Sequence, residues 1–186
     1  RPGFLGLADI GPLFVENRYI RSGDTRLYYP HYTLRNLWRL SRVVDPVRLR
    51  MEFLNPAKKA DLYGDDPLAP SRWPADALFA ITMVASPLAW MELSDVPAEV
   101  RAAWKPLIAA WKRHRAALHG GLVVPVGAAP DGEAWTGFVS SQSASAHVLL
   151  FREANSSPRY RLPSDALPFV PASVQVLGGR GTSRVR

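Results

Sequence analysis

The chain has 186 residues, of which 47% are hydrophobic and 21% are charged, and it contains no cysteine. This length and composition predict one folded domain or slightly more and exclude a mostly disordered protein. The lack of cysteine excludes a disulfide scaffold and a thiolate metal site. No apolar run reaches the ~20 residues that a membrane span needs, so we expect no membrane partner.

The net charge is +7, from 23 basic and 16 acidic residues. Most of the basic residues are arginines scattered along the chain, whereas a nucleic-acid-binding surface needs them clustered. The sequence also lacks a known nucleic-acid-binding motif. We therefore expect no nucleic-acid partner, and the positive charge leaves a nucleic-acid-binding protein as the third-ranked hypothesis for this chain.

The chain begins with Arg1 and runs at once into an apolar stretch, without an initiator methionine or a signal-peptide pattern. This beginning is typical of the interior of a larger fold. We expect a preceding part of the same chain to be missing and any targeting signal to lie there. The sequence is therefore consistent with a location in the bacterial cytoplasm and equally with export from the cell.

The first half of the chain predicts strands that alternate with helices. Residues 4–15 predict a buried segment that ends in a strand, and residues 31–44 follow a helical period with arginines on the outer face. Apolar and charged residues alternate at 47–53, which predicts a strand with one polar face. Asn55 and Pro56 end this strand.

A long loop at residues 56–75 comes next, and loops of this length within a compact fold are often functional. Two helices are predicted after it, at 76–90 and 97–119. The second has an apolar side rich in tryptophan and leucine and ends at Gly120-Gly121.

After Gly121 the pattern changes to short apolar or alternating runs separated by glycine, proline and serine. These runs predict four antiparallel strands, at residues 122–126, 134–139, 146–152 and 170–177. We therefore divide the chain into a first domain at residues 1–120 and an antiparallel β-sandwich domain at residues 121–186.

The order of elements in residues 1–120 is typical of βα units in a parallel α/β fold. Two units cannot close a sheet, and the simplest completion is a (β/α)₈ barrel of which these are the last units. Barrel enzymes carry their chemistry where strands end and loops begin. The candidate positions are therefore Glu16 and Asn17 after the first strand, and residues 55–66 after the second.

These features resemble the carboxyl-terminal third of clan D glycoside hydrolases, the α-galactosidase-like enzymes of family 36. The resemblance covers roughly residues 4–155. It rests on the run Phe14-Val15-Glu16-Asn17-Arg18-Tyr19, the helix at 97–119 that leads through glycine into a β domain, and the strand-like segments at 125–127, 135–138 and 145–155.

The resemblance implies a (β/α)₈ barrel with a C-terminal antiparallel β domain, and retaining hydrolysis of α-glycosides, with α-galactosides as the expected substrates. It places Glu16 on the general acid/base position, where the family has aspartate, and Asn17 on the asparagine that follows. Val15 stands where the family has serine. The nucleophilic aspartate would lie on an earlier strand, so the piece alone is expected to be inactive.

A retaining glycosidase needs two carboxyl groups about 5–5.5 Å apart, one of them with a raised pKa. Glu16 can fill the acid/base role if its strand end is buried; alternatively it forms a structural ion pair with Arg18 or Arg21. Asn17, Arg18 and Asn55 are candidates for hydrogen bonds to sugar hydroxyls, and Arg18 is equally consistent with a surface position.

We expect no metal and no cofactor. The aspartates of the long loop lack the spacing of a Ca²⁺ site, and His114 and His119 lack the spacing of a zinc site. Glycine-rich nucleotide-binding motifs are also lacking. The expected partners are an oligosaccharide or glycoside substrate, the missing part of the same chain and a possible second copy. The alternative function is a non-catalytic carbohydrate-binding or structural module.

Overall fold

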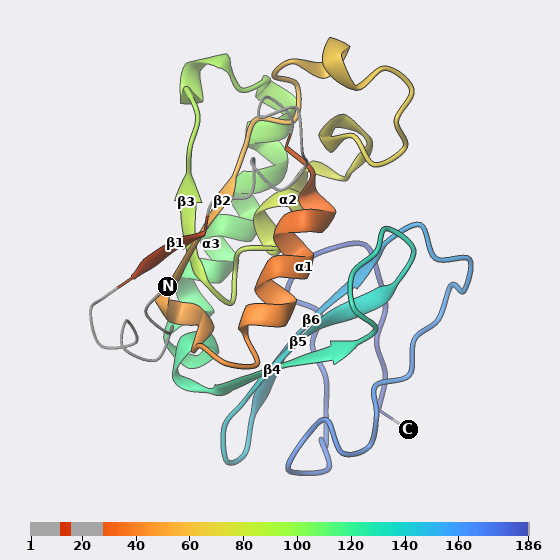
Figure 1. Ribbon diagram of the computed structural model, residues 1–186. Coiled ribbons are helices and arrows are strands. Elements are labelled where there is room, and N and C mark those ends of the chain that lie inside the picture. The colour runs from red at the N-terminus through yellow and green to blue at the C-terminus, as the bar shows by residue number, and fades with distance from the viewer. Residues whose placement is uncertain (1–11, 16–27, 186) are drawn as a thin grey trace.

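The computed structural model describes residues 12–15 and 28–185, which form a helix-covered parallel sheet and a separate antiparallel sheet (Figure 1). The parallel sheet has the order β1 (Leu13–Val15), β2 (Leu49–Phe53) and β3 (Ser86–Ala89). The α-helices are α1 (Pro30–Leu40), α2 (Ala75–Ala80) and α3 (Ala98–Gly120). The antiparallel sheet has the order β4 (Leu122–Gly127), β5 (Trp135–Ser141) and β6 (Ala146–Arg152). Short 3₁₀ turns lie at Pro46–Arg48, Ala60–Tyr63, Pro70–Arg72 and Leu93–Asp95.

The central strand β2 has one apolar face, as its alternating sequence predicts. Leu49, Met51 and Phe53 are buried and pack with apolar side chains of the three helices. On the opposite face, Arg50 lies in register with Phe14 of β1, and Glu52 lies in register with Leu88 of β3. The helices therefore cover one side of the parallel sheet, and a row of charged and aromatic side chains occupies the other.

Helix α3 matches the predicted helix at 97–119 to within one residue at each end. Two of its tryptophans donate indole N–H bonds across the helical layer. Trp104 reaches the Ala75 carbonyl at 2.6 Å, and Trp111 reaches the Met83 carbonyl at 3.0 Å. A buried indole needs such a partner, so these two bonds fix α3 against α2 and the turn that follows it.

The predicted helix at 76–90 is wrong in its second half. Helix α2 ends at Ala80, and after a turn the chain forms β3, which pairs with β2 in parallel. Pro87 explains this difference, because proline in a helix interior removes a hydrogen bond and clashes with the preceding turn. An edge strand tolerates proline, and β3 lies at the edge of the described sheet.

The antiparallel sheet confirms the three predicted strands that begin at residues 122, 134 and 146, to within one residue at each start. The run at 170–177 forms no strand, and Val170 is 90% exposed. Pro171 lies within this run and lacks the N–H that a ladder needs. The described residues thus form one antiparallel sheet where a sandwich was expected, and an open three-stranded parallel sheet; neither the sandwich nor the (β/α)₈ barrel is confirmed.

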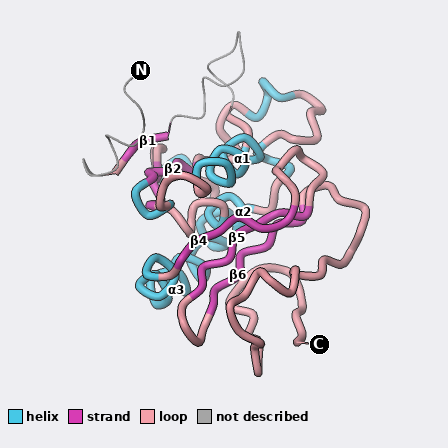
Figure 2. The backbone as a smooth tube through the Cα atoms, turned by 60° about the horizontal axis from the view of Figure 1, so that its bottom comes forward, coloured by secondary structure: helices cyan, strands magenta, loops and turns pink. Residues whose placement is uncertain are grey.

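The two sheets share one hydrophobic core. The chain nevertheless changes from helix to antiparallel strand at Gly120-Gly121 as predicted, where α3 leads into β4 (Figure 2). Phe138 of β5 and Leu118 of α3 belong to the same buried cluster as the helix-facing side chains of β2. The Trp38 indole of α1 also donates to the Val126 carbonyl of β4 at 3.2 Å.

Glu153 follows β6 and organises the connection between β4 and β5. Its Oε2 accepts backbone N–H bonds from Asp131, Gly132 and Ala134 at 3.0–3.1 Å, and the residue is 8% exposed. Burial raises the pKa of this carboxyl above its ordinary value, and the three N–H donors offset only part of that effect.

We expect Glu153→Gln to remove a pH dependence of stability. A carboxyl with a raised pKa in the folded state favours folding when protonated, so its contribution falls as the pH rises through that pKa. Glutamine keeps an acceptor oxygen without the charge. Wild type should therefore lose stability relative to the variant as the pH rises above the ordinary range of glutamate, with a constant difference at higher pH.

Urea unfolding of both proteins between about pH 4 and about pH 8 measures this difference. Glu133→Gln is the matched control, because Glu133 is an exposed glutamate of the same connection. Parallel pH profiles for wild type and Glu153→Gln would contradict the expectation.

Candidate functional site

A pocket of about 570 Å³ lies at the carboxyl ends of β2 and β3. It is lined by Tyr28, Leu54, Asn55, Lys58, Lys59, Tyr63, Pro70, Ala89, Trp90, Met91 and Glu92. Ligand sites of parallel α/β folds lie at this end of the strands, where loops supply polar groups. The pocket is therefore the candidate functional site.

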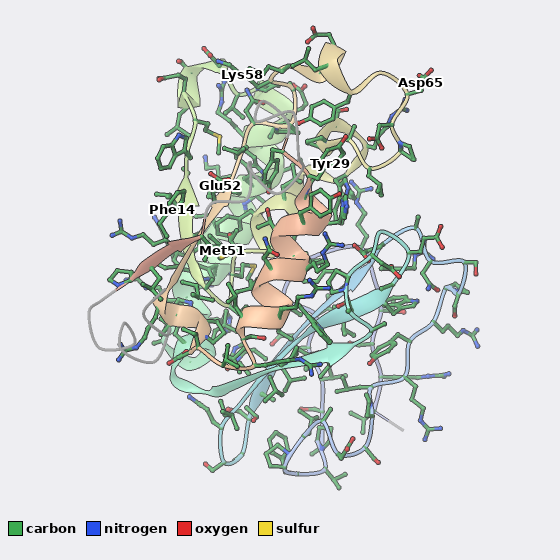
Figure 3. The ribbon with its side chains drawn as sticks, viewed as in Figure 1. Phe14, Tyr29, Met51, Glu52, Lys58 and Asp65 are labelled. Carbon is green, nitrogen blue, oxygen red and sulfur yellow. The ribbon has the colours of Figure 1, made fainter. Side chains whose placement is uncertain are left out.

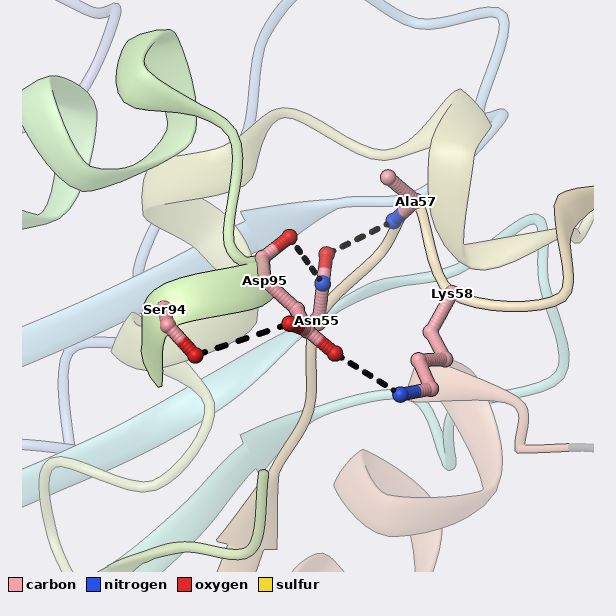
Figure 4. Close-up of polar contacts among 5 residues, drawn as sticks. All are labelled: Asn55, Ala57, Lys58, Ser94 and Asp95. Atoms are coloured by element: carbon pink, nitrogen blue, oxygen red, sulfur yellow. Dashed lines mark hydrogen bonds and ion pairs between the residues drawn. The ribbon is translucent and has the colours of Figure 1, made fainter. Parts of the chain in front are cut away.

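Asn55 joins the loop after β2 to the loop after β3 (Figure 4). Its Nδ2 donates to the Asp95 carbonyl at 3.0 Å, and its Oδ1 accepts from the Ala57 N–H at 3.0 Å. Nearby, Lys58 Nζ and Asp95 Oδ2 form an exposed ion pair at 3.0 Å. Asn55 thus lines the predicted strand end, and both ends of its amide also hold the pocket wall in place.

Tyrosines fix the long loop against the chain that leads into α1. The Tyr63 hydroxyl accepts from the Tyr28 N–H and donates to the Tyr28 carbonyl, both at 2.9 Å. The Tyr29 hydroxyl donates to Asp66 Oδ2 at 2.7 Å, and Asp66 Oδ1 accepts from the Leu68 N–H at 2.9 Å. Asp66 therefore organises this loop, while Asp61 and Asp65 are exposed.

Glu52 belongs to β2 and lies on the sheet face opposite the buried Met51, which packs against the helices (Figure 3). It is 0% exposed. Burial raises the pKa of the pocket residue Tyr28 well above its ordinary range, and the negative charge of Glu52 adds to this effect. The phenol of Tyr28 therefore stays protonated at ordinary pH.

An aromatic pair adjoins the pocket. Trp90, directly after β3, is 48% exposed and stacks on Phe14 of β1, which is 41% exposed. The ring centroids are 5.2 Å apart and the ring planes differ by 20°. Sequence reasoning missed Trp90 because residues 76–90 were interpreted as one helix. Pro87 was the signal against that helix, because proline disfavours a helix interior and is tolerated in an edge strand.

Glu16, Asn17 and Arg18, the predicted acid/base and two predicted sugar-binding residues, lie outside the described residues. Strand β1 ends at Val15, directly before Glu16 in the sequence. Of the four predicted site residues, Asn55 is therefore the one that can be placed. Lys58, Lys59 and Tyr63 of the pocket lie within the candidate range 55–66, whereas Tyr28, Trp90 and Glu92 lie outside the predicted positions.

Across residues 12–15 and 28–185, no group of three or more histidine, aspartate or glutamate side chains is arranged to hold a metal ion. His114 of α3 instead contacts His147 of β6 at 3.4 Å, and His119 contacts the Met83 carbonyl at 3.1 Å. Burial, together with the nearby His114, lowers the pKa of His147. No helix among the described residues combines the length and the apolar character required to span a membrane.

Comparison with models of known protein families, with curated proteins and with solved structures found no match to this chain.

We expect Asn55→Ala to lower the free energy of unfolding by about 1–3 kcal/mol, because it leaves the Asp95 carbonyl and the Ala57 N–H without their partner. Lys58→Ala is the control, because the Lys58–Asp95 pair spans the same loops at 56% and 49% side-chain exposure. This control should change stability by less than about 1 kcal/mol. Urea unfolding measures both values, and equal stability of the two variants would contradict the role given to Asn55.

Proposed function

We propose that the chain is part of a retaining glycoside hydrolase that acts on α-glycosides, with α-galactosides as substrates. The observation that supports this most is the pocket at the carboxyl ends of two neighbouring parallel strands. Barrel enzymes place their active sites there, and the wall of this pocket combines an asparagine, two lysines, a glutamate and an exposed indole. Such a mixture of polar groups and an apolar ring suits a sugar.

The parallel sheet supports completion by further βα units. Its helices all pack on one face, while Phe14 and Arg50 are exposed on the other. Parallel sheets are usually covered on both faces, and within a closed barrel the second face becomes the packed interior. Strands β1 and β3 form the edges to which neighbouring strands would pair. In the proposed enzyme, these side chains would lie inside a (β/α)₈ barrel followed by the antiparallel domain.

In the proposed mechanism Glu16 is the general acid/base. It protonates the departing glycosidic oxygen and then accepts a proton from the water that hydrolyses the glycosyl-enzyme. The nucleophilic carboxylate comes from another barrel strand. Asn17, Arg18 and Asn55 bind sugar hydroxyls; Asn55 keeps spare hydrogen-bonding capacity, because its Nδ2 carries a second N–H and its Oδ1 a second lone pair.

The alternative is a carbohydrate-binding module without catalysis. The exposed indole beside the pocket favours sugar binding as such and suits either function. Substitution of Glu16 distinguishes the two functions, because an enzyme needs an acid/base and a binding module does not.

We expect Glu16→Gln to lower kcat on an α-galactoside with a poor leaving group by about 10²–10⁴-fold, because the leaving oxygen then departs without a proton. The enzyme to assay is the natural protein that contains this chain. An aryl galactoside with an acidic leaving group needs little protonation, so its glycosylation rate should fall much less. Glu99→Gln, a change of an exposed glutamate on α3, is the control. Full activity of Glu16→Gln on both substrates would show that Glu16 is not the general acid/base.

A further inference from the structure

The position of Trp90 calls for an explanation. A large apolar side chain that is 48% exposed lies at the carboxyl end of β3, and it lines the pocket. Its indole stacks on the ring of Phe14. Exposed apolar surface that is gathered at one place and bordered by polar groups is typical of a binding site.

The orientation of the indole is set by the fold. Phe14 lies in β1 and Trp90 directly follows β3, the two edge strands of the described sheet, and their rings are stacked with an interplanar angle of 20°. Phe14 belongs to β1, whose register against β2 places it beside Arg50 on the face that the helices leave uncovered. The indole is therefore held against a second ring before any ligand arrives, which lowers the entropy lost on binding.

The polar groups around the indole suit hydroxyl groups. Asn55, Lys59 and Glu92 line the same pocket and offer an amide, a cation and a carboxylate. A sugar ring presents C–H groups on its faces and hydroxyls at its rim, so one face can lie on an aromatic ring while the rim forms hydrogen bonds. We infer that Trp90 is a stacking residue for the apolar face of a pyranose ring bound in this pocket, with Phe14 as its positioning residue.

The inference rests on the proposed function and gives it a substrate specificity. In galactose the axial 4-hydroxyl leaves the C–H groups of C3, C4 and C5 together on one face of the ring. In glucose the equatorial 4-hydroxyl breaks up this apolar patch. Stacking on Trp90 therefore favours a terminal galactoside over the corresponding glucoside.

The test measures the affinity of methyl α-galactoside and methyl α-glucoside for the natural protein that contains this chain, by titration calorimetry. Wild type should prefer the galactoside. Trp90→Ala should weaken galactoside binding by about tenfold and bring the two affinities together. Trp90→Phe should keep part of the preference, and Phe14→Ala should weaken it with Trp90 still present.

Trp135→Ala is the matched control. Trp135 lies in β5 and also stacks on an aromatic ring, Tyr160, with centroids 5.7 Å apart and an interplanar angle of 20°. Its loss should leave both sugar affinities unchanged. Thermal unfolding checks that each variant is folded, and Trp90→Phe provides the result if Trp90→Ala does not fold.

The possible outcomes separate this inference from the proposed function. Unchanged galactoside affinity in folded Trp90→Ala or Trp90→Phe would overturn the stacking role and leave the glycosidase proposal standing. A wild-type protein that hydrolyses α-galactosides without preference over glucosides would also overturn the stacking role. A wild type that neither binds nor hydrolyses either sugar would contradict the proposed function. A Trp90→Ala protein that changes its sedimentation but not its sugar affinity would identify the aromatic pair as a contact between copies and overturn the inference.

Discussion

The burial of one face of β2 is the constraint on which the rest of the structure depends. Leu49, Met51 and Phe53 lie at the centre of two clusters that draw together all three helices and part of the antiparallel sheet. Because side chains in a strand alternate, burying these three directs Arg50 and Glu52 to the other face. The same strand then delivers Asn55 to its carboxyl end. One alternating segment therefore determines the core, the polar face of the sheet and the position of the pocket.

The pocket wall is built from loops that the fold holds in place. Asn55 joins the loops after β2 and β3, and Tyr63 holds the long loop to the chain before α1. Loops fixed by buried hydrogen bonds present their side chains with little loss of entropy when a ligand binds. A binding site on a parallel sheet requires this arrangement, in which rigid strands support loops that hydrogen bonds hold in place at the carboxyl ends of the strands. It is consistent with the proposed glycosidase.

Sequence reasoning predicted the elements whose patterns are strong and local. The alternation in β2, the amphipathic period of α3 and the glycines after it are each sufficient to identify their structure. The strand β3 was missed because its run of small and apolar residues suits a buried helix equally well, and pairing with β2 decides between them. That error hid Trp90. Tyr63 lies within the candidate range 55–66, but its contact with Tyr28 could not be predicted, because the two residues are far apart in the chain and meet only in the fold. The run at 170–177 shows the reverse case, where apolar alternation suggested a strand but Pro171 interrupts it.

The most direct test of the account is the stereochemistry of the first product released from an α-galactoside by the natural protein that contains this chain. A proton NMR time course distinguishes the two anomers of free galactose before they equilibrate. The account predicts that α-galactose appears first, because two successive displacements retain the configuration. The first appearance of β-galactose would contradict a retaining mechanism, and the absence of any galactose release would contradict the proposal that the pocket belongs to a glycosidase.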